Sequence, residues 1–256
     1  MNIAIILSGG TGTRLGADIP KQYIEVNGRT IISYCLECFE ACEDIDVIQV
    51  VADSAWQETI AEERFTKIIG FSKPGATMQL SIVSGLEDVK AYISCKRNNS
   101  IECDMGNGIE SDIEDEKDST MDNHTVIIHD AARPLVSEKL LKRLIDATAS
   151  HQGAMPVLPM KDTVYYSKDG QSIDSLLERK CIFAGQAPEA FKLGAYYNAN
   201  RKLSEDEMLK INGSTEPAIL AGMDVVMVDG EEDNFKITTR EDLERFKQKG
   251  VQLCTK

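Results

Sequence analysis

The chain has 256 residues, of which 42% are hydrophobic and 27% are charged, as in an ordinary globular protein. Its formal net charge of −14 argues against a nucleic-acid partner, because binding a phosphate backbone requires a basic face. No apolar run reaches the ~18 residues of a membrane span, and the apolar start at residues 1–7 is too short for a signal peptide. We therefore expect a cytoplasmic protein without a membrane partner, whose seven cysteines are reduced.

Short β-branched apolar segments alternate with helical patterns along the chain. The predicted strands are Ile3–Leu7, Val47–Val51, Thr125–Ile128, Ala154–Leu158 and Val225–Val228. The predicted helices are Thr30–Glu40, Ser54–Lys67, Thr77–Tyr92, Glu138–Ser150 and Arg240–Lys249. This alternation predicts a single α/β domain over residues 1–256, with a mostly parallel sheet sandwiched by helices. Ligands of such sheets bind beyond the carboxyl ends of the strands, where residues 8–16 and 129–134 fall.

Two segments interrupt the alternation. Residues 94–124 hold nine acidic and three basic side chains but few apolar ones, so we expect a mobile acidic surface insertion, with a partner-binding tail as the alternative. Residues 161–179 hold a Lys168-Asp169-Gly170 turn between two polar, β-leaning stretches. This pattern predicts a projecting β-arm over residues 162–179, and arms of this kind commonly pair subunits.

Three cysteines, Cys35, Cys38 and Cys42, recur at helical spacing. A buried helix face accounts for this spacing, because residues three and four apart lie on one side of a helix. A metal or redox site is the alternative, although no second ligand pair with zinc-site spacing follows.

A glycine-rich loop follows the first predicted strand. The loop and the short motif behind it read Leu7-Ser8-Gly9-Gly10-Thr11-Gly12-Thr13-Arg14-Leu15-Gly16 and Pro20-Lys21-Gln22. Glycines here let the backbone approach a ligand and present N–H groups to phosphate oxygens. The loop matches neither a Walker loop nor a dinucleotide fingerprint. Its cations Arg14 and Lys21 suit a triphosphate that gains charge in the transition state, and a plain turn with surface cations is the alternative.

Four downstream motifs complete a recognisable set. They are His129-Asp130-Ala131-Ala132-Arg133-Pro134, Asp162-Thr163, Gln186-Ala187-Pro188 and Asp233-Asn234-Phe235-Lys236-Ile237-Thr238. With the glycine loop, they resemble the cytidylyltransferases that act on 2-C-methyl-D-erythritol 4-phosphate and on ribitol 5-phosphate, over nearly the whole chain apart from the acidic segment. The resemblance implies a Rossmann-like, GT-A-like nucleotidyltransferase sheet. It also implies transfer of CMP from CTP to a polyol phosphate with release of pyrophosphate, for isoprenoid precursor or cell-surface glycan synthesis.

From the residues alone, Asp130 follows a strand at the ligand edge, where a carboxylate holds Mg²⁺ or caps the next turn. Arg133 either grips a phosphate or forms a salt bridge to Asp130. Gly75 and Ser81 are small residues that suit a pyrimidine-binding site. The alternative is a purely structural loop followed by the start of a helix.

The resemblance implies a role for each site residue. The implied catalytic cations are Arg14, Lys21 and Lys236. The implied nucleotide-binding residues are Ser8, Gly9, Gly10, Thr11, Gly12, Gly75 and Ser81. The implied acceptor-binding residues are Asp130, Arg133, Thr163, Arg179 and Ala187. Mg²⁺ is the implied cofactor, with Asp130 and Asp233 as its ligands.

Three departures from the family pattern affect what the resemblance implies. Met78 stands where arginine is usual, Ala187 where threonine is usual, and Glu216 where aspartate is usual. The last two belong to the acceptor side, so acceptor identity is the open point. The resemblance also implies a homodimer in which the arm reaches the partner's acceptor site. The alternatives are uridylyl or adenylyl transfer to a sugar 1-phosphate, and a nucleotide-binding paralogue without catalysis.

Overall fold

The computed structural model describes residues 1–10, 16, 19–97 and 121–253, and the side chains of these residues up to 249. Of the predicted site residues, Thr11, Gly12 and Arg14 lie outside the described residues. The central part of the predicted acidic insertion, residues 98–120, lies outside them as well.

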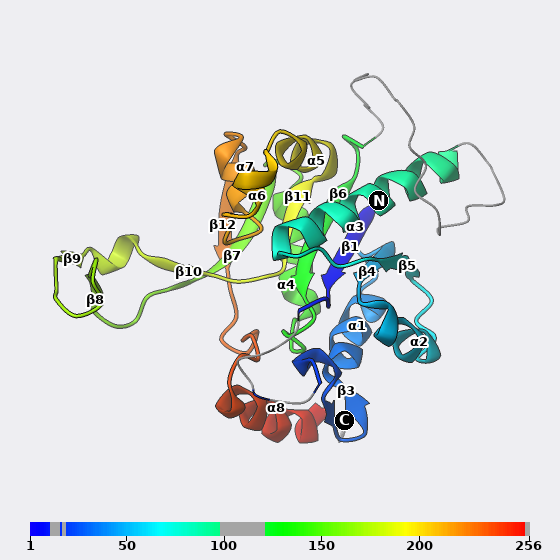
Figure 1. Cartoon of the computed structure of the whole chain (residues 1–256), viewed down its shortest axis with the longest axis horizontal. Helices are drawn as coiled ribbons and strands as arrows, with labels where there is room; N and C mark the ends of the chain where they lie inside the picture. The colour runs from blue at the N-terminus through cyan, green and yellow to red at the C-terminus, as the bar shows by residue number, and fades with distance from the viewer. Residues whose placement is uncertain (11–15, 17–18, 98–120, 254–256) are drawn as a thin grey trace.

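A central mixed sheet runs through the molecule (Figure 1). Its strands are β1 (Asn2–Leu7), β4 (Val47–Val51), β5 (Ile68–Ser72), β6 (Thr125–Asp130), β7 (Gly153–Pro159), β10 (Phe183–Gly185), β11 (Glu189–Lys192) and β12 (Val225–Asp229). Strand β1 is parallel to its neighbours β4 and β6, β5 is parallel to β4, and β12 is parallel to β7. Antiparallel β11 lies between β6 and β7, and antiparallel β10 pairs with the far end of β7. The predicted mostly parallel α/β sheet is confirmed, with β10 and β11 as unpredicted antiparallel additions.

Helices cover both faces of the sheet (Figure 1). They are α1 (Ile31–Ala41), α2 (Ser54–Glu62), α3 (Met78–Arg97), α4 (Glu138–Ala147), α5 (Leu193–Arg201), α6 (Glu205–Met208), α7 (Glu216–Leu220) and α8 (Arg240–Leu253). Successive side chains of β1 point to opposite faces. Ala4 and Ile6 therefore pack in one apolar core with α1 and α4, while Ile3 and Ile5 pack in another with α3 and α5.

Residues 19–30, before α1, contain a short helical turn and a hairpin. The loop after β1 leads into η2 (Lys21–Tyr23) and the hairpin of β2 (Glu25–Val26) with β3 (Arg29–Thr30). Asn27 and Gly28 close this hairpin with φ of 53° and 76°, as the left-handed turn of a tight hairpin requires. A third apolar cluster joins this hairpin to α1 and α8, and Phe246 is fully buried in it.

Two predicted boundaries are wrong. Helix α2 ends at Glu62, because Arg64 adopts a left-handed φ of 58° and the chain turns into β5. Helix α3 continues to Arg97, into the predicted acidic insertion, and Met121 at the other end is buried against the core of α3 and α5. Both ends of the predicted insertion therefore belong to the packed fold.

The prediction that Cys35, Cys38 and Cys42 lie on a buried helix face is confirmed in part. Cys35 and Cys42 are fully buried free thiols, Cys38 is partly buried, and burial raises the pKa of Cys35 and Cys38. The described part of the chain contains no group of three or more His, Cys, Asp or Glu side chains placed to hold a metal. Cys95 is disulfide-bonded, so the expectation of fully reduced cysteines is wrong at this position.

The predicted arm projects from the sheet as a hairpin of β8 (Val164–Tyr166) and β9 (Ser175–Leu177) (Figure 1). Asp169 organises its turn, because its Oδ1 accepts hydrogen bonds from the N–H groups of Gln171 and Ser172, both at 2.8 Å. These bonds hold the pKa of Asp169 well below its usual range. Across the described residues, no helix is long and apolar enough to cross a membrane.

Candidate functional site

A cavity of about 560 Å³ opens at the carboxyl ends of β1 and β6, as predicted for ligand binding in such a sheet. The predicted site residues that line it are Gly9, Gly10, Lys21, Gly75, Ser81, Asp130 and Lys236. These residues come from four separate sequence motifs. The fold therefore brings the glycine loop, the segment before α3, the end of β6 and the segment after β12 to one place.

Gln22 holds the described start of the glycine loop. Its Nε2 donates to the carbonyl oxygens of Ser8 at 2.6 Å and Gly10 at 2.8 Å. The N–H of a trans peptide points opposite to its C=O, so the N–H of Gly9 is directed away from Gln22. A Cβ on Gly9 would lie 2.3 Å from Cβ of Pro74, so this position requires glycine. The sequence motif contained Gln22, but reasoning from it assigned this residue no role.

Hydrogen bonds to the first turns of α3 close the loop that precedes this helix. The N–H of Gly75 donates to Oγ of Ser81 at 3.0 Å, and this hydroxyl donates to the carbonyl of Thr77 at 2.9 Å. A Cβ on Gly75 would lie 2.7 Å from the backbone carbon of Leu80. The wall that Gly75 and Ser81 give to the cavity is therefore narrow and made largely of backbone.

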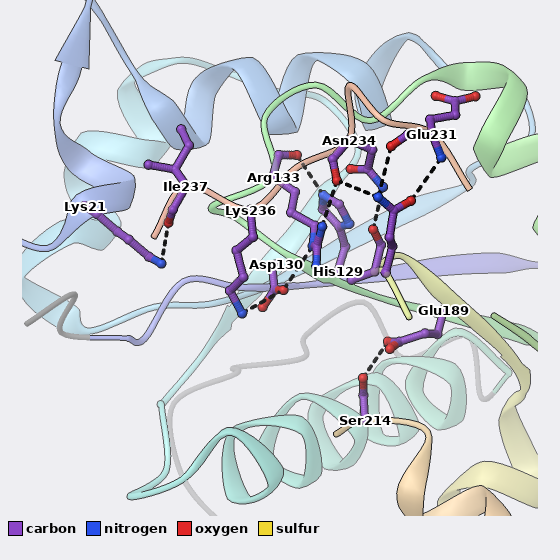
Figure 2. A network of polar contacts seen from close by, with 12 residues as sticks. Lys21, His129, Asp130, Arg133, Glu189, Ser214, Glu231, Asn234, Lys236 and Ile237 are labelled. Carbon is purple, nitrogen blue, oxygen red and sulfur yellow. Dashed lines mark hydrogen bonds and ion pairs between the residues drawn. The ribbon is translucent and has the colours of Figure 1, made fainter. Parts of the chain in front are cut away.

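Asp130 is the charged centre of the site (Figure 2). Its Oδ2 lies 2.9 Å from Nζ of Lys236 and 3.5 Å from Nε of Arg133. Burial raises the pKa of Asp130, but the two cations lower it, and the net shift is downward. The side chain is therefore an ionised carboxylate. The salt bridge from Arg133 that the sequence left open is present.

Lys21 approaches the same cavity from η2. Its Nζ donates to the carbonyl of Ile237 at 2.6 Å, next to Lys236 in sequence (Figure 2). This bond ties the lysine that follows the glycine loop to the segment that carries the second lysine. Two cationic side chains from opposite ends of the sequence thus line one cavity.

A buried network positions the segment that carries Lys236 (Figure 2). The carbonyl of Asn234 accepts from NH1 of Arg133 at 2.7 Å, and Nδ2 of Asn234 donates to the carbonyl of Ala187 at 2.7 Å. Gln186 binds the same segment through both ends of its amide, with distances of 2.9 Å and 3.0 Å to the backbone of Glu231. Sequence reasoning quoted Gln186 and Asn234 within motifs but missed this role, because it depends on partners distant in sequence.

A second cavity of about 140 Å³ adjoins the first. Leu7, Met78, Asp130 and Lys236 line both cavities, so the two meet at the ion pair between Asp130 and Lys236. The predicted acceptor residues Arg133 and Ala187 line the second cavity.

The second cavity also contains a carboxylate that sequence reasoning missed. Glu189, at the start of β11, is buried, and its Oε2 accepts a hydrogen bond from Oγ of Ser214 at 2.5 Å. Burial raises the pKa of Glu189 to about 7. His129, on the neighbouring strand, is buried and donates from Nε2 to the carbonyl of Arg133 at 3.1 Å, and burial lowers its pKa to about 4.

Of the predicted site residues that the structure describes, four line neither cavity: Ser8, Thr163, Arg179 and Asp233. Ser8 is buried, and its hydroxyl donates to the hydroxyl of Tyr23 at 2.7 Å, so it supports the loop from behind. Thr163 is exposed at the base of the arm. Arg179 is also exposed, and its NH1 donates to the carbonyl of Lys161 at 2.8 Å. Within one chain, the arm residues are not part of the site.

Asp233 is not brought to the cavities either. Its Oδ1 lies 2.5 Å from Nζ of Lys249 and 3.7 Å from NH2 of Arg245, on the side facing α8. Of the two predicted magnesium ligands, only Asp130 lines the cavity as the described residues form it. One carboxylate fits such an ion when substrate phosphates and water complete its shell.

Comparisons with known proteins identify the family of the chain. Residues 2–93 and 115–248 match the family model of IspD, 2-C-methyl-D-erythritol 4-phosphate cytidylyltransferase. The chain is 30% identical to a ribitol-5-phosphate cytidylyltransferase of Streptococcus agalactiae serotype V, over 96% of this chain and 94% of the relative. It is also 30% identical to a 2-C-methyl-D-erythritol 4-phosphate cytidylyltransferase of Clostridium perfringens, over 94% and 95%.

A solved structure shows the same fold. The 4-diphosphocytidyl-2C-methyl-D-erythritol synthase of Anaerococcus prevotii superposes with a TM-score of 0.73 at 25% identity, covering 98% of this chain and 96% of that one. The likeness extends over the whole length of both chains, and the family match includes all the motifs that line the cavities. The chain therefore belongs to the IspD family of cytidylyltransferases.

Proposed function

We propose that this enzyme transfers CMP from CTP to the phosphate of a small polyol phosphate and releases pyrophosphate. The observation that carries the proposal is the junction of the two cavities at Asp130 and Lys236. A larger and a smaller ligand, bound in these cavities, would meet at one charged centre. That arrangement suits a group transfer between them, because catalysis by proximity requires both reactants at one point.

The larger cavity is the proposed CTP site. The glycine loop and Lys21 provide backbone N–H groups and a cation for the triphosphate. The narrow, backbone-lined wall at Gly75 and Ser81 favours a pyrimidine over a bulkier purine. Arg14 completes the proposed set of phosphate cations.

The smaller cavity is the proposed acceptor site. The acceptor's phosphate would bind near Arg133 and Lys236, with one of its oxygens directed at the α-phosphorus of CTP. A phosphate monoester is a nucleophile at neutral pH, so the reaction needs no general base. The protein contributes positioning and cationic charge where negative charge develops, from Lys21 and Lys236.

Magnesium is the proposed cofactor. It would be held by Asp130, which the neighbouring cations keep ionised, together with phosphate oxygens of CTP. When bound, the ion would neutralise charge on the triphosphate and orient it for in-line displacement.

The proposed acceptors are ribitol 5-phosphate and 2-C-methyl-D-erythritol 4-phosphate, which the names of the relatives give for those proteins. Ala187 lines the proposed acceptor cavity, at a position where members of the family usually have threonine. Without the threonine hydroxyl, the site lacks one hydrogen bond to a charged group, and such a bond is worth about 1.5–3 kcal/mol. We expect weaker acceptor binding than in a member with threonine, and Ala187→Thr should lower KM for the true acceptor.

A homodimer formed through the arm is part of the proposal. Tyr165, Ile173 and Leu176 on the arm are 55%, 68% and 65% exposed, although such side chains are normally covered. A partner subunit would cover them. Thr163 and Arg179, which line neither of the two described cavities of their own chain, would then contribute to the partner's acceptor site.

Pyrophosphate release with CTP and Mg²⁺, measured across a panel of polyol and sugar phosphates, tests the proposal. We expect turnover with at least one of the two polyol phosphates, and comparing kcat/KM between them identifies the acceptor. Thermal-shift measurements with CTP, UTP and ATP separate cytidylyl transfer from the uridylyl and adenylyl alternatives. CTP binding without turnover of any acceptor would favour the catalytically inactive paralogue instead.

A further inference from the structure

The second cavity is electrostatically divided. Lys236 lines both cavities and marks their junction, whereas Glu189 and Ser214 line only the second. In Figure 2, Glu189 and Ser214 lie on one side of Asp130 and Lys236 lies on the other. A ligand in this cavity would meet Arg133 and the ion pair of Lys236 with Asp130 where it faces CTP. At its other end it would meet the carboxylate of Glu189, which has no cation partner among the described residues.

Glu189 has an unusual environment for a buried carboxylate. Among the described residues, no lysine, arginine or histidine lies within ion-pairing distance of it. Its hydrogen bond from Ser214 engages Oε2, and within the described chain no donor reaches Oε1. Because Glu189 lines the second cavity, a ligand bound there can supply the hydrogen-bond donors that the described chain does not give to Oε1.

A carboxylate selects its ligand by chemistry. When ionised it only accepts hydrogen bonds, so it favours hydroxyl groups and repels a second anion. The volume of about 140 Å³ equals that of roughly five waters at ~30 Å³ each, which suits a short hydroxylated carbon chain.

We propose that Glu189, oriented by Ser214, is the specificity-determining residue that binds the hydroxyl-bearing end of the acceptor and excludes acceptors with an anion at that end. This inference rests on the proposed function and adds to it. It assigns the acceptor class as one with a single anionic end. It also explains how the acceptor enters in one orientation, because a phosphate directed at Glu189 would be repelled.

The test compares two acceptors of equal length, ribitol 5-phosphate and the corresponding phosphorylated aldonic acid, which has a carboxylate at the far end. Assays at about pH 8.5 keep the carboxylate ionised, since the pKa of Glu189 is about 7. For Glu189→Gln we expect KM for the polyol phosphate to rise about 10-fold, with kcat within a few-fold. The preference for polyol over acid, as a ratio of kcat/KM, should fall by at least about 10-fold.

Matched variants separate charge from structure. Glu189→Asp keeps the charge and should keep the rejection of the acid, while Ser214→Ala should weaken polyol binding less than Glu189→Gln does. Glu58→Gln removes an exposed carboxylate of α2 that lines neither cavity, and should match the wild type. CTP-induced thermal shifts of each variant report folding and an intact nucleotide site.

The outcomes are distinct. If the wild type turns over ribitol 5-phosphate but Glu189→Gln keeps the wild-type ratio, the inference is wrong and the proposed function stands. If the wild type turns over no polyol phosphate, both are wrong. A Glu189→Asp variant that accepts the acid as readily as Glu189→Gln would also overturn the role of the charge.

Discussion

Nζ of Lys236 lies 2.9 Å from Oδ2 of Asp130, and this ion pair stands where the two cavities meet. The lysine reaches it because the preceding residues are held by Arg133, Gln186 and the buried amide of Asn234. The carboxylate is held at the end of a central strand. The position of the charged centre therefore depends on hydrogen bonds between side chains and backbone carbonyls that join residues 231–234 to two other segments, one at Arg133 and one at Gln186 and Ala187.

Asp130→Asn should abolish most turnover and raise the magnesium concentration needed for half-maximal activity. The reason is that the substitution removes the carboxylate proposed to hold the ion. Activity measured against magnesium concentration gives the result. The comparison variant is Asp233→Asn, whose carboxylate pairs with Lys249 away from the cavities and should leave the magnesium dependence unchanged. Equal shifts in both variants would support the sequence-based expectation of two ligands.

Lys21→Ala should lower kcat by about 10²-fold or more, because it removes a cation that acts on the developing charge of the triphosphate. Steady-state kinetics at saturating CTP measure this. Lys139→Ala, an exposed residue of α4, provides the control for general loss of positive charge. Turnover of Lys21→Ala within a few-fold of wild type would show that the glycine loop is not the catalytic phosphate site.

Gly9→Ala should lower the melting temperature and weaken CTP binding, because the new Cβ would lie 2.3 Å from Cβ of Pro74 and must displace the loop. Overpacking of this kind costs about 1–3 kcal/mol. Gly10→Ala is the matched variant, since its Cβ would meet no atom of the described residues within 4 Å, and it should keep the wild-type melting temperature. Thermal unfolding of the two variants without ligand makes the comparison, and equal melting temperatures would contradict the packing argument.

The stability of the protein should include a contribution from Glu189 that falls as pH rises. Its pKa is about 7 in the folded state and near 4.5 in the unfolded chain, so the folded state binds more protons between these values. Linkage then makes the free energy of unfolding decrease from about pH 4.5 to about pH 7 and level off above that.

Glu189→Gln removes this contribution. Its stability relative to wild type should therefore rise across the same window, by about 1–3 kcal/mol. Urea unfolding at several pH values measures the difference, with Glu58→Gln as the control. A difference that is constant with pH would show that Glu189 titrates normally.

The protein should sediment as a dimer at micromolar concentration, and Ile173→Ser with Leu176→Ser should produce monomers. Both side chains are exposed on the arm and would lose the apolar contact proposed to hold the partner. Analytical ultracentrifugation gives the result, and KM for the acceptor should rise in the monomer. A wild-type monomer would remove the proposed contribution of Thr163 and Arg179 across subunits.

Local sequence patterns predicted much of the fold. The buried strands β1, β4 and β6 were predicted because continuous β-branched apolar runs are a local property, and the glycine loop could be placed at the end of β1 for the same reason. Strand β5, which directly follows the helix predicted to Lys67, was not predicted. Strands β10 and β11 were missed because they are short and lack a clear apolar period. They exist because the edge of β7 and the gap between β6 and β7 satisfy their backbone groups.

In the site, too, some features follow from local motifs and others from long-range packing. The motifs alone were enough to assign Lys21, Asp130 and Lys236 to one family, and these residues do line one cavity. Long-range packing, by contrast, turns Asp233 toward α8 and buries Glu189 beside Ser214. Their partners are distant in sequence, and the environment of a charged side chain is set by what the fold packs around it rather than by its neighbours in the chain.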